Sequence, residues 1–367
     1  MSSDLRQSLQ DRRLAAPLLE EIRRSAADIS RSVRVMEVCG THTVAIRRSG
    51  VHSLLPDNII LVSGPGCPVC VTPTSYIDNV LQLLDNTEAT IVSFGDMLKV
   101  PGSDGRSLAG YRGGGRVRIV YSPAELIPIA RDSTKAVVFL AIGFETTIPT
   151  VAAAFLKARR DGIDNLFLYT AFKTVPPALH ALLDSPDRNL DGFLLPGHVS
   201  VIIGEKPYLF LEERGGVPGV ITGFEPLDLL QGISAMLKQI ARGQQRVENG
   251  YTRAVRPDGN PRARELMEQL LEPVDALWRG FGRIPASGLA LSSAFRDADA
   301  RLHFSLPPLH NVEPPGCLCA QVLQGRVIPR ECTLFGKRCT PETPVGPCMV
   351  SSEGTCAASF RYGEASL

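Results

Sequence analysis

The sequence predicts an α/β protein whose parallel sheets are covered by helices on both faces. Three observations favour this class: short apolar runs recur along the chain, each run ends in a polar or glycine-rich turn, and a helical stretch follows each turn. The apolar runs expected to form strands are 33–38, 59–62, 90–94, 117–121, 137–142, 166–169 and 193–195. Because loops at the carboxyl ends of such strands build the active site, the residues after each run are the first candidates for function.

The other elements follow from periodicity. Residues 3–32 carry leucine and isoleucine at helical spacing on a polar background, and segments 226–241 and 261–279 also have a helical pattern. The pentapeptides 141–145 and 221–225 resemble each other, and each places a glutamate just past a strand. Two similar α/β units would explain this echo, and a chain of 367 residues is longer than one hydrophobic core usually serves.

Composition argues against several classes of function. The 39 Lys and Arg residues balance 38 Asp and Glu residues, so neither a nucleic acid nor an anionic membrane is an expected partner. The apolar runs are too short to span a membrane, and the N-terminus lacks the apolar core of a signal peptide. A phosphate-binding loop of the type G-x-x-x-x-G-K is also absent from the sequence, so we expect no nucleotide site. A cytoplasmic protein is therefore expected.

The nine cysteines are distributed unevenly. Cys39, Cys67 and Cys70 lie early, the stretch 71–316 contains none, and six crowd into the last 51 residues. Cytosolic thiols are kept reduced, so structural disulfides explain this distribution poorly. The sequence therefore predicts two separate chemical sites.

The segment 64–70, Gly-Pro-Gly-Cys-Pro-Val-Cys, places a C-x-x-C pair directly after a predicted strand. A helix that begins near Cys67 would stabilise a thiolate there through its unpaired amides and its dipole. Cysteines at this spacing can cycle between dithiol and disulfide. Half of a zinc site and a pair of buried structural cysteines are the alternatives, and the strand-end position favours redox or ligand chemistry over both.

The segment 39–43, Cys-Gly-Thr-His-Thr, also follows a strand. Cys39 and His42 are candidates for a nucleophile and its base, or for a soft-metal ligand with a hydrogen-bonding neighbour. A small buried cysteine and a surface histidine remain the alternative. The surrounding Gly and Thr residues favour function.

Three further polar residues share the strand-end position: Asp96, Glu145 and His198. Taken singly, the two carboxylates are more simply helix caps, and the histidine is more simply structural. Taken together, they are expected to line the walls of one central cleft.

The six late cysteines are Cys317, Cys319, Cys332, Cys339, Cys348 and Cys356. They lie among many Pro and Gly residues, and irregular backbone of this kind lets four thiolates converge on an iron–sulfur cluster. The gaps between them differ from the paired short knuckles of zinc ribbons and fingers. Cys317 and Cys319 are too close in sequence to serve comfortably as two ligands. Spacing alone leaves iron and zinc open, and a disulfide scaffold is a more distant alternative.

Together these motifs resemble the HypD family of nickel–iron hydrogenase maturation factors. The resemblance runs nearly end to end and is carried by four segments: 39–43, 64–70, Gly-Phe-Glu-Thr-Thr at 143–147, and Gly-Pro-Cys-Met-Val-Ser-Ser-Glu-Gly at 346–354. It implies a scaffold on which the hydrogenase iron acquires cyanide and carbon monoxide. It also implies an N-terminal helical segment (1–34), two similar α/β domains (35–130 and 131–225) and a helical and iron–sulfur region (226–367) around a central cleft.

The resemblance further implies roles for the cysteines. Cys39, with a cysteine of a small HypC-type partner, would hold the low-spin iron, and Cys67 and Cys70 would form a redox pair. A [4Fe–4S] cluster would be bound by Cys332, Cys339, Cys356 and either Cys317 or Cys319. A HypE-type partner would deliver cyanide made by a HypF-type protein.

Cyanide transfer needs hydrogen-bond donors near the iron, and Thr41, His42, Thr43 and Thr146 are the candidates, with Glu145 in the same expected site. A stand-alone thiol/disulfide oxidoreductase with a cluster is the main alternative function, and a zinc-stabilised binding module is the third. Whether the maturation factor turns over as an enzyme, and in which redox state Cys67 and Cys70 rest, stay open at this point.

Overall fold

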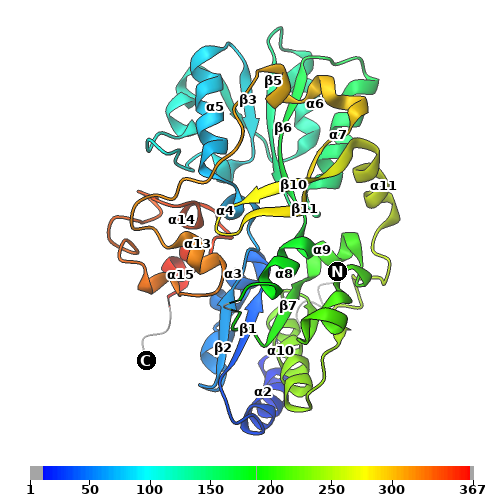
Figure 1. The fold of residues 1–367 in the computed structure, drawn as a ribbon, viewed down its shortest axis with the longest axis vertical. Coiled ribbons are helices and arrows are strands. Elements are labelled where there is room, and N and C mark those ends of the chain that lie inside the picture. Colours follow the sequence, from blue (N-terminus) through cyan, green and yellow to red (C-terminus); the bar gives the residue numbers. More distant parts are fainter. Residues whose placement is uncertain (1–10, 187, 364–367) are drawn as a thin grey trace.

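The computed structural model describes residues 11–186 and 188–363. Its strands form two sheets, one in each half of the molecule (Figure 1). The first sheet has the order β2-β1-β7-β8-β9, and every neighbouring pair in it is parallel. Its strands are β1 (Val33–Glu37), β2 (Ile59–Ser63), β7 (Gly192–Pro196), β8 (Gly219–Thr222) and β9 (Val247–Asn249).

The second sheet has the order β10-β11-β6-β5-β3-β4. Strands β4, β3, β5 and β6 are parallel to one another, whereas β11 pairs antiparallel with both β6 and β10. Its strands are β3 (Thr90–Ser93), β4 (Val117–Ile119), β5 (Val137–Gly143), β6 (Leu166–Lys173), β10 (Leu271–Trp278) and β11 (Gly282–Leu291). Strand β5 is buried along its whole length, as a central strand of a sheet covered on both faces should be. The predicted α/β class is confirmed.

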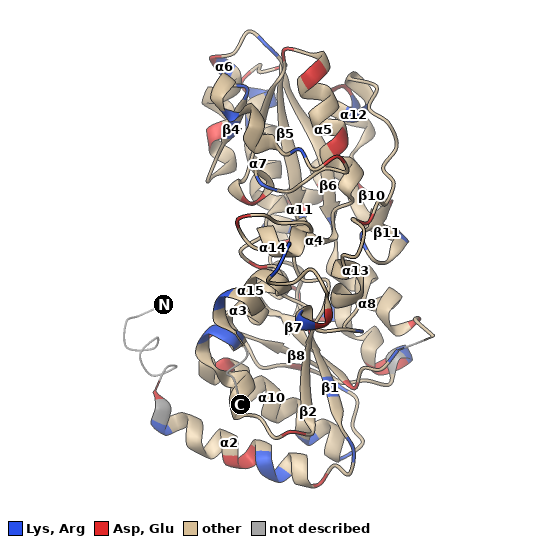
Figure 2. Ribbon diagram, turned by 90° about the vertical axis from the view of Figure 1, so that its left-hand side faces the viewer, with Lys and Arg blue, Asp and Glu red and all other residues tan. Residues whose placement is uncertain are grey.

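Helices cover the sheets and connect the strands (Figures 1 and 2). They are α2 (Arg12–Ala27), α3 (Gly40–Ser49), α4 (Pro68–Val71), α5 (Thr74–Asn86), α6 (Leu126–Arg131), α7 (Ile148–Arg160), α8 (Val175–Leu183), α9 (Gly197–Ile203), α10 (Pro226–Ala241), α11 (Pro261–Leu270), α12 (Ala300–His303), α13 (Cys319–Leu323), α14 (Pro347–Val350) and α15 (Thr355–Tyr362). The predicted helix 226–241 is confirmed as α10. Of the predicted helix 3–32, residues 12–27 form α2, and residues 3–10 lie outside the described part of the chain.

The two sheets do not follow the expected linear division of the chain. Segment 35–130 supplies β1 and β2 to the first sheet but β3 and β4 to the second, and segment 131–225 supplies strands to both sheets as well. The chain therefore crosses between the sheets after β2, after β6 and again after β9. Strand pairing is a non-local property that apolar runs do not encode, which explains why the order of the strands was not predicted.

The predicted helix 261–279 is wrong in its second half. Helix α11 ends at Leu270, and residues 271–278 form strand β10, which pairs with β11. Leu270, Val274 and Trp278 are four residues apart and mimic a helical face. Pro273, however, has no backbone N–H and clashes with the preceding turn of a helix, so the helix ends before it.

The C-terminal segment with α13, α14 and α15 lies between the two halves of the molecule (Figure 2). Helix α15 packs on α3 of the first half, and α14 packs on α4. Among the described residues, none of the helices combines the length and the apolar character needed to cross a membrane.

Candidate functional site

Cys39 lies at the point where β1 ends and α3 begins, as the sequence predicts. The Gly40 N–H donates to the Gly66 carbonyl at 3.0 Å, which ties the loop after β1 to the loop after its neighbour β2. A Cβ atom on Gly66 would collide with the backbone of Cys39. Only a glycine at position 66 allows the two loops to approach this closely.

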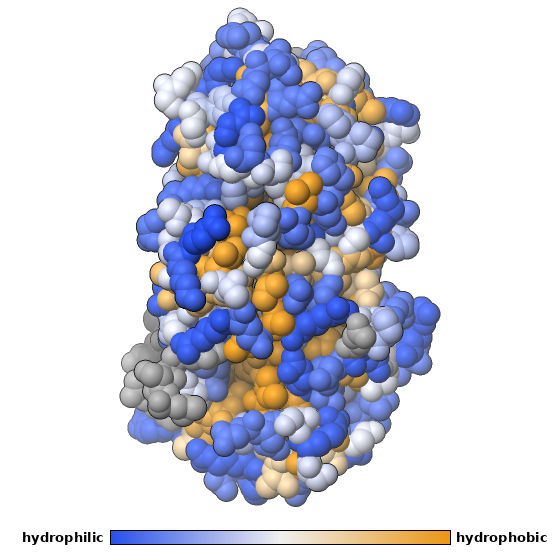
Figure 3. Space-filling model, turned by 60° about the vertical axis from the view of Figure 1, so that its left-hand side comes forward, coloured by the Kyte–Doolittle hydropathy of each residue, from blue (hydrophilic) through white to orange (hydrophobic). Residues whose placement is uncertain are grey.

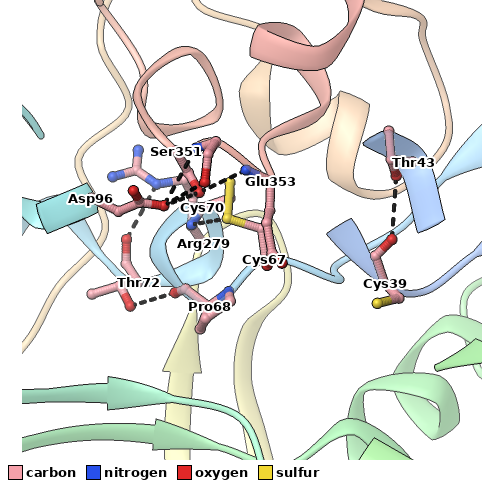
Figure 4. Close-up of a disulfide and its surroundings, with 11 residues drawn as sticks. Cys39, Thr43, Cys67, Pro68, Cys70, Thr72, Asp96, Arg279, Ser351 and Glu353 are labelled. Atoms are coloured by element: carbon pink, nitrogen blue, oxygen red, sulfur yellow. Dashed lines mark hydrogen bonds between the residues drawn. A yellow bond between two sulfur atoms is a disulfide. The ribbon is translucent and has the colours of Figure 1, made fainter. Parts of the chain in front are cut away.

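Cys67 and Cys70 are joined by a disulfide across the first turn of α4 (Figure 4). Cys67 precedes the helix, and its sulfur accepts the Cys70 N–H at 3.2 Å, as the predicted helix start requires. Both cysteines are buried. The fully buried Arg279 holds the end of the turn, because its N–H donates to the Val71 carbonyl at 2.8 Å and its guanidinium donates to Thr74.

One C-terminal loop joins the two halves of the site. Asp96, after β3 of the second sheet, accepts a hydrogen bond from Ser351 Oγ at 2.9 Å. Two residues further on, Glu353 accepts the hydroxyl proton of Thr41 at 2.6 Å, beside Cys39 of the first sheet. A Cβ atom on Gly40 would lie 2.6 Å from the side chain of Glu353. The carboxyl ends of both sheets therefore meet at loop 351–353.

Replacing Asp96 by alanine should loosen this loop. The Asp96 carboxylate also accepts from the backbone and hydroxyl of Ser352, each at 3.3 Å. Loss of these partly exposed bonds should speed amide hydrogen exchange at residues 351–356 by about tenfold. Asp96→Asn keeps one acceptor oxygen and should show a smaller increase. Equal exchange in all three proteins, measured by mass spectrometry, would contradict this role.

The Cys39 thiol is poorly disposed to ionise in the free chain. Burial, with the nearby Glu353 carboxylate as the second cause, raises the pKa of Cys39 to about 11. The backbone amides of Thr41 and His42 at the start of α3 act in the opposite direction on the same pKa. A bound cation would reverse this balance, since a metal favours the thiolate over the thiol.

His42 lies in the same turn, and its ring points to the end of β8. Its Nε2 atom lies 3.0 Å from the Gly223 carbonyl and 3.2 Å from the Thr222 carbonyl, at the end of β8. The ring is fully buried against Phe224, and burial lowers the pKa of His42 to about 4. The imidazole is therefore neutral at physiological pH and anchors α3 to β8 through its Nε2–H.

A buried carboxyl at the end of β1, two residues before Cys39, was not predicted from the sequence. Glu37 accepts a hydrogen bond from Ser63 Oγ at 2.8 Å, and Thr43 lies 3.4 Å from the same hydroxyl. Burial raises the pKa of Glu37 to about 7. The available signal was a charged residue inside the apolar run 33–38, just before the cysteine.

Glu145 also lies where predicted, past the end of β5, and is 1% exposed. One carboxyl oxygen accepts the Val175 N–H at 2.9 Å at the start of α8, and among the described residues the other has no hydrogen-bond partner. Burial raises the pKa of Glu145 to about 7. The carboxyl group links β5 to α8 and lies near the buried Tyr208. The pKa of Tyr208 is raised mainly by burial and, as the second cause, by the Glu145 carboxylate.

Glu145→Gln should change how stability depends on pH. The folded-state pKa of Glu145 is raised above the unfolded value, so its ionisation lowers the free energy of unfolding as the pH rises from about 4.5 to 7. The free energy of unfolding of the glutamine variant does not fall in this way. Relative to the parent protein it should therefore rise by about 2–3 kcal/mol between pH 4.5 and pH 8. Denaturant unfolding at both pH values measures the difference. Parallel pH curves for the two proteins would rule out a neutral Glu145 in the fold.

The late cysteines converge on one narrow cavity. Five of the six cysteines line it: Cys317, Cys319, Cys332, Cys339 and Cys356. The other lining residues include the apolar Leu334, Phe335 and Met349. All six late cysteines are free thiols. Cys348 is fully buried beside Cys319 and Cys356.

The donor set fits an iron–sulfur cluster. The thiols come from separate loops, the cavity is apolar, and the Val345 N–H donates to Cys339 Sγ at 3.3 Å, as amides do around cluster sulfurs. The backbone at Gly346 lies close to two of the sulfurs, because a Cβ atom there would be 2.9 Å from Cys317 Sγ and 3.3 Å from Cys319 Sγ. Within residues 11–186 and 188–363, no three Cys, His, Asp or Glu side chains are grouped to hold a single metal ion.

The cysteine cavity and the disulfide belong to one apolar core. Cys67 and Cys70 share a hydrophobic cluster with Cys319, Cys339 and other late cysteines. Helix α14, which carries Cys348, packs on α4, and α15, which carries Cys356, packs on the helix that Cys39 precedes. The structure thus brings the two sets of cysteines together from opposite ends of the chain.

The other predicted residues take different positions. The hydroxyl of Thr43 is buried and faces the Cys39 carbonyl and Ser63, and Thr146 is half-buried in the turn before α7. His198 is exposed at the start of α9 and stacks on Phe224, with ring centroids 3.8 Å apart. His42 and His198 therefore contact the same aromatic ring.

Comparison with known proteins covers almost the whole chain. A family model described as HypD: Hydrogenase formation hypA family matches residues 13–363. The hydrogenase expression/formation protein HupD of Azotobacter chroococcum is 44% identical over 96% of this chain and 94% of its own length. The hydrogenase maturation factor HypD of Rhodobacter capsulatus is 42% identical over 97% of both chains, and that of Escherichia coli K12 is 41% identical over 94% of both.

Proposed function

Because this chain belongs to the HypD family of hydrogenase formation proteins, we propose that it is the scaffold on which the iron of a nickel–iron hydrogenase acquires its cyanide and carbon monoxide ligands. The iron is the cargo of this scaffold, and Cys39 is the residue that binds it. A soft thiolate suits a low-spin iron that carries strong-field ligands. The second thiolate comes from a small HypC-type partner, and a HypE-type partner delivers the cyanide.

The surroundings of Cys39 support its assignment as the iron ligand. Its sulfur faces the N–H groups at the start of α3, and the Thr41–Glu353 hydrogen bond lies beside it. We assign to Thr41 the task of donating to a bound cyanide: its one hydroxyl proton, which Glu353 accepts in the free chain, turns toward the ligand when the iron is bound. His42 and Thr43 hold the loop instead, since their polar atoms face β8 and Ser63. Glu145 supports the neighbouring α8.

Cys67 and Cys70 form the redox pair of the proposal. Opening their disulfide takes two electrons and two protons and yields two thiols. A [4Fe–4S] cluster held by Cys332, Cys339, Cys356 and one of the 317/319 pair would supply single electrons when bound. The shared apolar core of the disulfide and the late cysteines supports this route.

A single observation carries the proposal: one C-terminal segment contributes both the thiol-lined cavity and the loop that contacts the turn after Cys39. Cavity cysteines lie on α13 and α15, and Glu353, in the loop between α14 and α15, accepts from Thr41. A disulfide and a cluster would serve a stand-alone oxidoreductase equally well. Such an enzyme, however, would not require a buried third thiol at the meeting point of both sheets.

Infrared spectroscopy of a purified complex tests the proposal. The full chain is co-produced with a HypC-type protein and the cyanide-forming partners, and the complex is isolated without oxygen. Cyanide and carbon monoxide stretching bands fall where proteins are transparent, so their presence on the complex would support the scaffold. A complex with a reducible disulfide but without such bands would favour the oxidoreductase.

A further inference from the structure

The surface over the cysteine cavity is basic, although the whole chain has a net charge of only +1. Between residues 316 and 363 the exposed charged side chains are five basic ones and two acidic ones: Arg326, Arg330, Lys337, Arg338 and Arg361 against Glu331 and Glu342. Helix α3, which packs against α15, adds the exposed Arg48 in its last turn, and part of the α3 ribbon has the blue of Lys and Arg in Figure 2. Basic residues therefore outnumber acidic ones on the exposed surface of this segment.

Three of these side chains belong to the two segments that meet at an exposed aromatic ring. We define the basic patch as Lys337, Arg338 and Arg361 together with Phe360, which is 40% exposed. Lys337 and Arg338 lie in the tight turn between Cys332 and Cys339, and Arg361 follows Phe360 in α15. The face that Figure 3 turns forward carries this part of the chain, and strongly hydrophilic side chains lie there beside apolar ones.

The patch is joined to the cavity by direct contacts. Phe360 contacts Phe335 edge to face, with ring centroids 6.1 Å apart, and Phe335 itself lines the cavity with the cysteines. The turn that carries the two exposed cations begins and ends at cavity cysteines. Two aromatic rings therefore connect the basic patch to the place where a cluster would be held.

From this geometry, and resting on the iron–sulfur site of the proposed function, we infer that the basic patch is the docking surface for a small acidic protein that carries one electron at a time. Charge complementarity with such a carrier steers its encounter with the patch and orients it over the cavity. An exposed aromatic ring on a basic surface is the kind of contact that anchors a transient interface.

The electron balance of the inference is simple. A reduced carrier gives up one electron and leaves oxidised, and two such encounters supply the pair that opens the Cys67–Cys70 disulfide. The two protons come from solvent. The carrier class is therefore a ferredoxin-like protein with an acidic surface, which is regenerated outside this chain.

Binding of a purified plant-type [2Fe–2S] ferredoxin to the full, anaerobically prepared chain tests the inference. Isothermal titration at low ionic strength should give a Kd that rises about tenfold or more in the double variant Lys337→Glu/Arg338→Glu, because attraction becomes repulsion. The matched control Arg112→Glu/Arg118→Glu makes the same charge change at exposed positions near β4 and should shift the Kd less than about twofold. Added salt should weaken binding to the parent protein.

Each outcome decides the inference. A specific loss at the patch supports it, whereas equal weakening by both double variants, or no binding by the parent protein, overturns it. Iron, sulfide and circular dichroism check that the variants are folded, and Arg361→Glu is the milder substitute if the double variant is not. Binding is measured without maturation partners, so its failure would leave the scaffold untouched. Missing cyanide bands, in turn, would leave the docking result untouched.

Discussion

Cys39→Ala is expected to abolish hydrogenase maturation while leaving the rest of the chain intact. The thiol is the proposed protein ligand of the cargo iron, and the alanine side chain has no donor to replace it. Loss of groups that only support metal ligands costs 10–100-fold in affinity, so loss of the ligand itself should cost about 100-fold or more. Hydrogenase activity in cells that depend on this chain, together with the infrared bands of the complex, measures the effect.

The variant carries its own internal control. Cys39 lies in the turn between β1 and α3 and is absent from the lining of the late-cysteine cavity. Cluster iron and sulfide should therefore stay at the parental level, and the Cys67–Cys70 pair should still cycle. Retained cyanide bands in Cys39→Ala would remove this residue from the proposed site. A simultaneous loss of cluster iron would instead indicate a general folding defect.

Cys339→Ala is expected to remove most of the bound iron from the purified chain. Cys339 lines the cavity, and its sulfur accepts the Val345 N–H, so it is one of the four proposed cluster ligands. A cluster that loses one thiolate from a set of four is no longer held. Iron and acid-labile sulfide should fall from about four per chain toward zero, and the visible absorption of the cluster should disappear.

Two comparisons sharpen this result. Cys348→Ala is the matched control, because Cys348 is fully buried beside Cys319 and Cys356 but is not a proposed ligand. It should keep its iron. Cys317→Ala and Cys319→Ala then decide the fourth ligand, since both sulfurs approach Gly346 and only one of the two variants should lose the cluster. Stoichiometric zinc without sulfide in the parent chain would overturn the whole assignment.

Local patterns were sufficient to predict strands β1 to β7 and the positions of the early cysteines. The apolar runs before Cys39, Cys67 and Glu145 correspond to β1, β2 and β5. Burial on both faces of a parallel sheet selects continuous apolar runs, so these strands are visible in a single sequence. The same reasoning failed for 271–278, where residues with helical spacing form β10.

The roles of individual polar side chains were less accessible. His42 belongs to the motif around Cys39, but its ring faces carbonyls of residues 222 and 223, about 180 positions away. Glu37 was not predicted as part of the site because an acidic residue in a strand is normally exposed, and only the packing of β1 between β2 and β7 buries it. Such orientations depend on neighbours that are remote in sequence.

The sequence by itself determined the α/β class, the strand-end motifs, the separation of the cysteines into two sets and the family. These features are local, because they follow from the period of apolar residues and from short motifs with defined spacing. Only the tertiary structure decided that the chain crosses between two sheets, and that Ser351 reaches Asp96 while Glu353 reaches Thr41. The physical reason is that hydrogen bonds across 255 and 312 residues form only after the strands have paired and the C-terminal segment has packed between the sheets.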